Sequence, residues 1–358
     1  MNTQAVSRFW SYETAWLSGP RFDLTFIVGV LVLALFSGFI VWNDPSLFKP
    51  VVLLDLWFLG YHHVIATFTK LGGTPGDRAE NKFLIYHLPF IVIGAVAVLG
   101  FTFGIWILFT IYFFWQWYHY TRQSYGISIF YRRKSATPIE ENHTVFLLTL
   151  WSIPVWGVLN RCHQGWDSFL FNPVWMPQVP TIVVALAATA SILLLAYWCV
   201  LRLIAFRNGN LPLGQTLFML SHFAAFYVGY ILIPDINIGW LVANIWHNAQ
   251  YILFVWLYNT KRFERESEDQ KTLVGWASQT QPVRIMMYFT GCLVLTTLIY
   301  STISNGLDIF AGHNPALLTT LYVVVFQTLN FHHYIVDSVI WKARKKQHQK
   351  VMNLKDVQ

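Results

Sequence analysis

Histidine recurs inside four hydrophobic stretches of this 358-residue chain, each time directly after an aromatic residue. The four motifs are YHH at 61–63, YH at 118–119, WH at 246–247 and FHH at 331–333. An ionisable side chain inside a bilayer is costly, so such residues usually face the interior of a helix bundle and serve a function. Because neutral imidazole is the commonest metal ligand, the pattern predicts a metal site buried in a membrane protein. The predicted ligands, which include one histidine of a further hydrophobic stretch, are His62, His63, His119, His222, His247, His332 and His333.

Amides and a carboxylate follow three of these histidines at helical spacing. The pairs are His119 with Gln123, His247 with Gln250, and His333 with Asp337. Residues three or four positions apart share one surface of a helix, and metal-bound histidines normally donate their second ring nitrogen to a carboxylate, carbonyl or water. We therefore predict that Asp337, Gln123 and Gln250 belong to the catalytic site and orient the histidines, with Asn244 and Asn330 as further candidates.

The composition is that of a membrane protein. Hydrophobic residues make up 55% of the chain and charged residues only 11%, whereas a soluble domain carries about 25% charged residues. The charges lie in short clusters between apolar runs of about 20 residues, the length that spans a bilayer. Cys162, Cys199 and Cys292 are too few and too far apart for a disulfide framework or a zinc ribbon.

The apolar runs predict an all-α, polytopic transmembrane bundle of about ten spans. The predicted spans are 22–42, 50–70, 83–100, 102–130, 143–160, 180–205, 212–233, 238–259, 284–303 and 316–341. Gly100 and Gly104 are the turn signals between the third and fourth spans. The fourth and tenth runs are longer than a bilayer requires, so we expect both to continue into the cytoplasm as helix.

The positions of Lys and Arg predict the orientation. With ten spans both termini lie on one side, and of the 24 Lys and Arg residues only Lys49 and Arg161 fall in loops on the other side. The other 22 (24 minus 2) mark the terminal side as cytoplasmic. These basic residues flank hydrophobic segments, so the net charge of +7 indicates membrane topology and no nucleic-acid partner.

Three regions follow from this organisation. Residues 1–20 are expected to form an interfacial segment with Trp10 and Trp16 at headgroup depth, 21–341 the transmembrane domain, and 342–358 a basic cytoplasmic tail. The expected location is a multi-pass position in a membrane, the bacterial inner membrane. In this topology the histidines of the four motifs lie roughly 12 to 18 Å below the cytoplasmic surface at 1.5 Å per residue.

The number and identity of the ions stay open. Adjacent histidines in a helix point about 100° apart, so one member of each HH pair suffices for a single ion, while two ions would use both. Imidazole suits Zn, Cu, Fe and Ni, and neutral histidines with one carboxylate fit non-haem Fe(II), which has open positions for O₂ and substrate. Haem held by two histidines on facing helices is the alternative.

The multiple spans, paired histidines near the cytoplasmic side and nearby Asn and Gln residues resemble the integral-membrane histidine-rich non-haem iron oxygenases. That class includes the membrane desaturases and hydroxylases and the Brp/Blh-type carotene dioxygenases. The desaturase boxes HxxxH and HxxHH are absent; this chain has HxxxQ at 119–123 and HxxQ at 247–250. The resemblance implies O₂-dependent oxidation of a lipophilic substrate, such as a carotenoid, isoprenoid or fatty-acyl chain, with an electron-donor protein as a possible partner.

Two other functions remain open from the sequence. A proton- or metal-coupled transporter also places polar residues at the membrane midplane, and residues 61–65 and 331–335 share an aromatic-His-His-X-Ile pattern that hints at a repeat. A haem-bearing electron-transfer protein would use the histidines as axial ligands.

Overall fold

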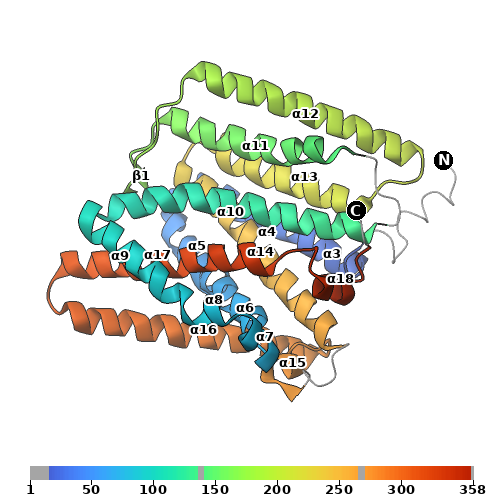
Figure 1. Cartoon of the computed structure of the whole chain (residues 1–358). Coiled ribbons are helices and arrows are strands. Elements are labelled where there is room, and N and C mark those ends of the chain that lie inside the picture. Colours follow the sequence, from blue (N-terminus) through green and yellow to red (C-terminus); the bar gives the residue numbers. More distant parts are fainter. Residues whose placement is uncertain (1–15, 136–140, 265–270, 356–358) are drawn as a thin grey trace.

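The computed structural model describes residues 16–135, 141–264 and 271–355. These residues form an all-α bundle with one two-stranded hairpin (Figure 1). The elements of the first half are α3 (Pro20–Leu24), η1 (Thr25–Gly29), α4 (Val30–Asn43), η2 (Pro45–Leu47), α5 (Phe48–Asp55), η3 (Leu56–Gly60), α6 (Tyr61–Leu71), α7 (Pro75–Glu80), α8 (Lys82–Tyr86), α9 (Leu88–Phe103), α10 (Ile105–Lys134) and α11 (His143–Gln164). Those of the second half are β1 (Ser168–Phe169), β2 (Asn172–Pro173), α12 (Thr181–Arg207), α13 (Leu213–Tyr227), η4 (Val228–Leu232), α14 (Ile236–Phe263), α15 (Leu273–Ala277), α16 (Pro282–Ala311), α17 (Pro315–Ile340) and α18 (Lys346–Met352).

Short polar residues and glycines fix where the long helices begin and end. The side chains of Asn142, Asp235 and Asn314 accept hydrogen bonds from the first backbone N–H groups of α11, α14 and α17, which satisfies donors that a helix start leaves free. Gly104 separates α9 from α10 with a φ of +93°, a backbone conformation that favours glycine. The predicted turn between the third and fourth spans is therefore confirmed.

Six helical segments in the described part of the chain are long and apolar enough to cross a membrane, which indicates an integral multi-pass protein. They are Pro20–Asn43, Pro45–Leu71, His143–Gln164, Thr181–Arg207, Leu213–Leu232 and Pro282–Ala311. Each of the ten predicted spans coincides with a helical segment, with bounds that differ by no more than eight residues, the largest difference being at the end of α16. The helices α10, α14 and α17 are long but less apolar, and they carry three of the four histidine motifs.

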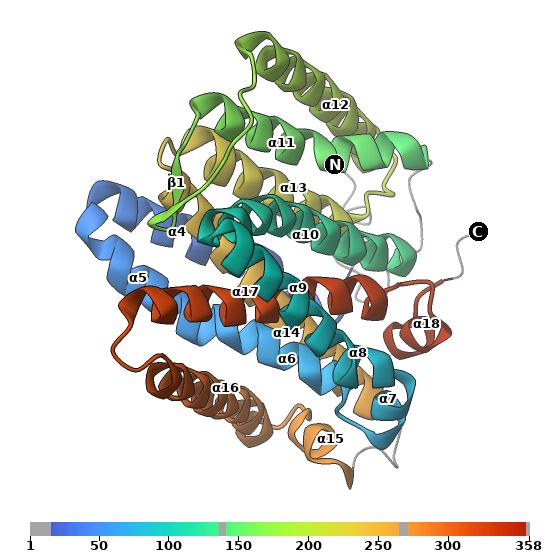
Figure 2. The same cartoon turned by 60° about the vertical axis from the view of Figure 1, so that its left-hand side comes forward.

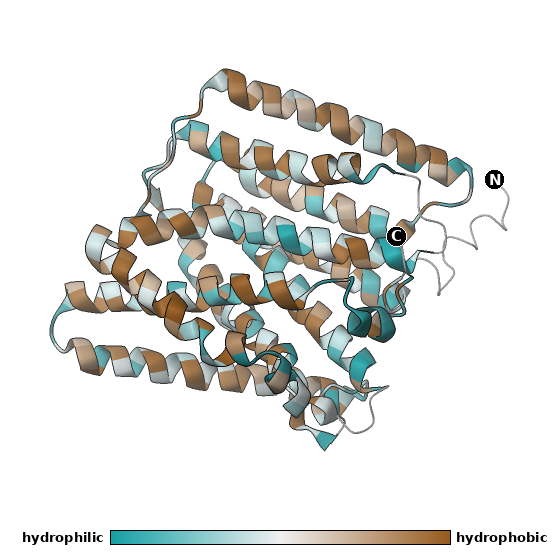
Figure 3. Ribbon diagram, viewed as in Figure 1, coloured by the Kyte–Doolittle hydropathy of each residue, from teal (hydrophilic) through white to brown (hydrophobic). Residues whose placement is uncertain are grey.

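Helix α14 is the centre of the bundle. Almost all of its residues are buried, and it crosses behind α10 and α17 in both views of the ribbon (Figures 1 and 2). Helices α12 and α16 form two opposite outer edges (Figure 2), and their most apolar stretches are only 11% and 22% buried. Hydrophobic residues dominate α12, whereas α18 is hydrophilic (Figure 3). Outward-facing apolar helices around a polar-bearing central helix are the arrangement expected in lipid.

The two ends of the described chain meet at one end of the bundle. One apolar cluster joins Leu17 and Phe26 to Phe130 of α10 and to Val351 and Met352 of α18. The basic tail thus folds back as a short docked helix. Most of the predicted interfacial segment 1–20, including Trp10, lies outside the described residues, and Trp16 is fully buried.

The docked tail should respond to pH through His348. This side chain is buried on α18, and its Nδ1 donates to the carbonyl of Lys342 at 2.9 Å. Burial, followed by the nearby charge of Lys70, lowers the pKa of His348 to about 3. A solvated histidine has a pKa of about 6.5, so the undocked tail binds a proton that the docked tail does not. Docking is therefore strongest above about pH 6.5 and weakens as the pH falls towards 3.

We expect the free energy of opening of residues 346–352 to be lower by about 2 kcal/mol at pH 5 than at pH 7, since 1.5 pH units at 1.36 kcal/mol each separate pH 5 from 6.5. Hydrogen exchange of these amides, corrected for intrinsic exchange rates, measures it. The variant His348→Phe keeps the ring contacts with Tyr258 and Trp341 and should lose the pH dependence. The same pH dependence in this variant would rule out His348 as its cause.

Candidate metal centre

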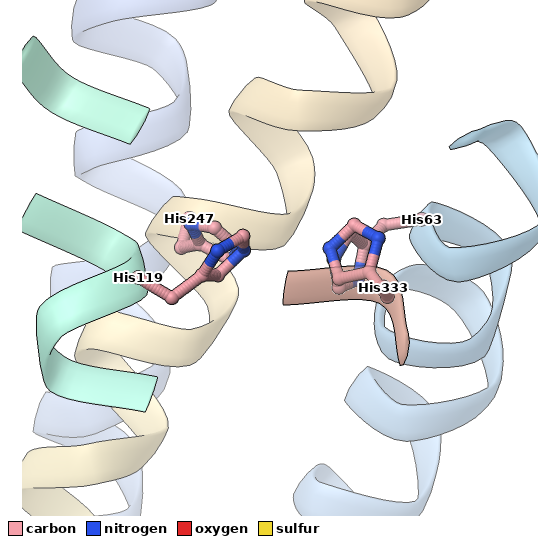
Figure 4. Close-up of side chains that lie close together, drawn as sticks. All are labelled: His63, His119, His247 and His333. Carbon is pink, nitrogen blue, oxygen red and sulfur yellow. The ribbon is translucent and has the colours of Figure 1, made fainter. Parts of the chain in front are cut away.

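Four helices that are far apart in sequence bring one histidine each to a single point. His63 comes from α6, His119 from α10, His247 from α14 and His333 from α17. One ring nitrogen of each lies within 4.8 Å of the others, and all four side chains are buried. The rings of His119 and His247 face those of His63 and His333 (Figure 4). His63 and His119 each pack against both His247 and His333. The ring centroids in these four pairs are 4.4 to 5.2 Å apart.

A π-helical segment, η3, directly precedes α6, the helix that carries His63. η3 ends at Gly60, directly before the YHH motif, and π-helical turns are often found at functional sites. The carbonyl of Gly60 accepts a hydrogen bond from His63 Nδ1 at 2.9 Å. Since a carbonyl oxygen can only accept, Nδ1 carries the proton and Nε2 of His63 presents a lone pair to the cluster.

Ring nitrogens without partners are the unusual feature of the cluster. Both nitrogens of His247 and Nε2 of His119 are buried and have no hydrogen-bond partner among the described residues. A buried polar atom left unpaired costs about 1 to 3 kcal/mol, and such atoms are rare in folded proteins. The two remaining Nε2 atoms, of His63 and His333, point at each other at 2.7 Å. The cluster is thus rich in lone pairs and poor in protons, which suits a cation.

A chain of hydroxyl groups connects His333 to Asp337. Nδ1 of His333 lies 2.9 Å from Thr67 Oγ1, which lies 2.9 Å from the hydroxyl of Tyr251. That hydroxyl donates to Asp337 Oδ1 at 2.7 Å and accepts from the indole N–H of Trp341 at 3.0 Å. The side chains therefore form one continuous path from the carboxylate to the back of the imidazole.

The positions of the protons along this path determine whether Asp337 is charged and whether His333 has a free lone pair. The three contacts between His333 and Asp337 need three protons, and the hydroxyls of Thr67 and Tyr251 supply two. Because Tyr251 donates to Asp337, Thr67 donates to Tyr251 and the third proton comes from Nδ1 of His333, with Asp337 ionised. In this arrangement Nε2 of His333 has a free lone pair and the carboxylate is negative, which favours a cation in the cluster.

Asp337 lies on the ligand side of the rings. Its Oδ2 is 3.4 Å from His333 Nε2 and 3.9 Å from His119 Nε2. We had expected Asp337 to hold the second ring nitrogen of His333, but Thr67 is at that nitrogen. The carboxylate instead adds negative charge next to the four imidazoles.

The predicted amides lie around the cluster in different ways. Gln123 donates to the backbone carbonyl of His247 at 3.2 Å, so it contacts α14 and not the ring of His119. Both polar atoms of the Gln250 side chain are buried without a partner among the described residues. Asn244 donates to Asp55 at 2.5 Å and accepts from Tyr120. Asn330 donates to Gln327 at 3.4 Å.

Three of the seven predicted ligands point away from the cluster. His332 Nε2 lies 2.8 Å from the carbonyl of Leu84, and His222 Nε2 lies 2.9 Å from that of Leu150. His62 Nδ1 lies 3.1 Å from the carbonyl of Phe58, and its ring lines a separate apolar cavity of about 600 Å³. One member of each HH pair therefore faces the cluster, as the 100° step between neighbouring helical residues requires.

The sequence did not single out several residues that support the rings. Thr67 lies four residues after His63 on α6, a spacing that places both on one helix face. Tyr120 stacks on His247 with a centroid distance of 4.0 Å, and Tyr334 stacks on His119 at 4.3 Å. Both tyrosines neighbour a motif histidine in sequence, so the aromatic residues around each motif were the available signal.

The residues present fit a single bare ion. Four nitrogens bound tetrahedrally to one ion at about 2.1 Å lie roughly 3.4 Å apart, and the four ring nitrogens here lie within 4.8 Å of one another. On binding an ion, the His63–His333 pair at 2.7 Å would move apart, and the more widely spaced pairs would move closer. The four imidazoles would hold the ion, and Asp337 would balance its charge.

We expect the variant Asp337→Asn to weaken metal binding by 10- to 100-fold, the usual effect of removing an outer-shell carboxylate. The substitution removes the negative charge beside the imidazoles and keeps an oxygen that can accept from Tyr251. Competition with a chelator of known affinity measures the loss. Asp55→Asn is the matched control, since Asp55 is also buried but contacts Asn244 instead of a histidine ring. Equal affinities in the two variants would contradict the role of Asp337.

Comparison of the chain with protein-family models, with curated proteins and with solved structures gives no match. What the fold and the site establish is a helical membrane protein with a buried group of four histidines that can hold a metal ion.

Proposed function

We propose that this protein is a membrane-embedded metal oxidoreductase that holds one non-haem iron ion with His63, His119, His247 and His333 and oxidises a lipophilic substrate. The observation that carries the proposal is the set of buried, unpaired ring nitrogens of His119 and His247. They lie beside the Nε2 pair of His63 and His333. A packed core of this kind has no reason to bury unpaired nitrogens together unless an ion binds them.

The packing of the rings favours a bare ion over haem. Two axial histidines must leave a slot for a macrocycle between them, whereas the rings here are in edge-to-face contact with centroids 4.4 to 5.2 Å apart. It also favours one ion over two. His62 and His332, the second members of the pairs, face backbone carbonyls, and the described residues contain one group of three or more potential ligands.

Iron is proposed because neutral histidines with a nearby carboxylate match the ligands that Fe(II) takes in O₂-using enzymes. When bound, such an ion supplies the one-electron and O₂ chemistry that side chains lack. The protein's own residues do the rest. The hydroxyls of Thr67 and Tyr251 hold the ring of His333, and Asp337 provides a carboxylate that can take up or release a proton through Tyr251. All four rings are buried, which limits the access of bulk water to the site.

The membrane supplies the proposed substrate. A centre enclosed by apolar helices is reached most easily by a molecule dissolved in hydrocarbon, such as a carotenoid, an isoprenoid or a fatty-acyl chain. We propose further that both termini are cytoplasmic, that the membrane is the bacterial inner membrane, and that a separate electron-donor protein supplies reducing equivalents. The bias of 22 of 24 basic residues toward one side of the ten-span topology supports this orientation.

The test is metal analysis and spectroscopy of the purified protein, followed by O₂ uptake with a chemical reductant and a membrane lipid extract. We expect about one iron per chain, no Soret absorption, and O₂ consumption that depends on both iron and lipid. A Soret band would identify a haem protein. Stoichiometric zinc without O₂ uptake would exclude the oxidoreductase, as would substrate flux across vesicles by protein that binds no metal.

A further inference from the structure

A second feature of the site is an elongated cavity of about 700 Å³ that begins at the histidine cluster. Helices α10, α14 and α17 and the start of the tail enclose it, and its lining includes His119 and Asp337. Small-molecule sites in proteins have volumes of roughly 300 to 1,000 Å³. On α10 the lining extends from Trp115 to Arg133, which is 18 residues or about 27 Å of helix. The cavity thus has the size and shape for a chain-like molecule.

The two ends of the cavity differ in chemistry. The end beyond His119 is aromatic, with Trp115, Tyr118 and Tyr334 in its lining. The other end has three basic residues, which are Arg133, Lys342 and Arg344, and the hydrogen bond from Arg133 to the carbonyl of Ala343 places them together. Arg122 also lines the cavity, but it lies three residues after His119, between the two ends. Among the described residues of the lining, Asp337 is the one carboxylate, and it lies against the histidine rings. The basic end therefore has an excess of positive charge that no lining residue there neutralises.

The basic residues at this end are also available to a ligand. Arg344 is exposed. Arg133 donates one N–H to the carbonyl of Ala343 at 3.2 Å, which is a neutral group, and it forms no ion pair within the described part of the chain. Guanidinium groups bind carboxylates and phosphates through strong, charge-assisted hydrogen bonds. Positive charge on the cytoplasmic side is expected for topology alone, but topology does not require it to converge on a cavity that reaches a metal centre.

We propose that this cavity binds an amphipathic molecule with one anionic head group, held by Arg133, Lys342 and Arg344, and an apolar chain that lies along α10 beside His119. The inference rests on the proposed function, because it makes this molecule the substrate of the same centre. It narrows the substrate class from lipophilic molecules in general to those that end in a carboxylate or a phosphate. A neutral hydrocarbon would leave the basic end without a partner.

A glycine in the wall allows a direct test of the site. A Cβ added at Gly126 meets no atom within 4 Å, and Gly126 lines the cavity. The Cβ of the variant Gly126→Leu therefore enters open space, and its longer side chain would occupy part of the cavity. The variant should also stabilise α10 because glycine is a poor helix former. Gly94 of α9 is the matched control, since an added Cβ there also meets nothing and the residue does not line the cavity.

Binding is measured with radiolabelled stearic acid, stearyl phosphate and stearyl alcohol at pH 8, on the full chain in phosphatidylcholine nanodiscs. We expect saturable binding of about one molecule per chain, with at least one of the two anions bound tenfold or more tightly than the alcohol. The tighter anion identifies the carboxylate or the phosphate as the natural head group. Gly126→Leu should lower the affinity at least tenfold and Gly94→Leu should leave it unchanged.

A pair of charge variants tests the head-group site. The double variant Lys342→Gln/Arg344→Gln should lose about tenfold in affinity for the anion and nothing for the alcohol. Lys346→Gln/Lys350→Gln removes the same charge from exposed positions of α18 that do not line the cavity and should bind as the unchanged protein does.

Three results would overturn the inference: equal binding of alcohol and anions, unchanged binding by Gly126→Leu, or an equal loss in both charge variants. Metal analysis of the same samples separates this outcome from failure of the proposed function. Anion binding as expected in protein without metal would support the cavity and refute the metal centre. Metal without anion preference would refute the cavity alone.

Discussion

Replacement of His247 by alanine should abolish stoichiometric metal binding. His247 lies on the central helix α14, and neither of its ring nitrogens has a partner among the described residues, so the ring can bind an ion. Loss of an outer-shell group already costs 10- to 100-fold in metal affinity, so loss of a ligand should cost more than about 100-fold. Metal content per purified chain should fall from about one to below about 0.1, and O₂ uptake should fall with it.

His222→Ala is the matched control for this variant. His222 was also predicted as a ligand, and it is as fully buried as His247, with both side chains 0% exposed. Its Nε2, however, lies against the carbonyl of Leu150. The two substitutions therefore open cavities of the same size, and only His247→Ala removes a ring from the cluster. Equal metal content in both variants, whether retained or lost, would refute the assignment of the cluster as a metal site.

The convergence of the histidine motifs could be expected from sequence because it depends on a strong constraint. An imidazole that faces lipid is costly. Four imidazoles at similar depth in separate spans are therefore expected to face the interior of the bundle, close to one another. Periodicity also specified the helices, so each predicted span coincides with a helical segment. The sequence does not show which histidine of each HH pair faces the cluster. Whether His62 or His63 faces the cluster depends on the rotation of α6, which the π-helical segment η3 helps to set.

The groups around the rings were harder to predict because they come from other helices. Thr67 and Tyr251 reach His333 across helix–helix contacts, and a single sequence carries no record of which helices are neighbours. Spacing suggested Asp337 as the partner for the back of His333. Helical spacing places two residues on one face but does not determine which ring nitrogen meets the carboxylate, and here it is Nε2.

The structural role of Arg161 could not be predicted from the count of Lys and Arg residues in loops. We expected it in a loop, as one of two basic residues on the non-cytoplasmic side. It lies instead in the last turn of α11 and is fully buried. Its guanidinium donates to the carbonyls of Gly229, Ile233 and Pro234 at 2.9, 2.7 and 2.6 Å. These carbonyls belong to η4 and to the residues that connect it to α14. Arg161 therefore holds in place the segment that leads into the helix of His247.

Arg161→Leu should therefore cause a large loss of stability, about 3 kcal/mol or more, because each carbonyl left unpaired in a buried position costs about 1 to 3 kcal/mol. The site cannot close around the smaller residue, since the backbones there already touch. A Cβ on Gly239 would lie 2.0 Å from the carbonyl oxygen of Gly229. Arg161→Lys should recover part of the loss, because an ammonium donates hydrogen bonds but lacks the planar fork. Reversible unfolding in mixed micelles measures both.

Lys49→Leu removes the other basic residue on that side, which is exposed, and should change stability by less than about 0.5 kcal/mol. A comparable loss in the Lys49 and Arg161 variants would mean that charge on that side, and not the buried hydrogen bonds, stabilises the bundle.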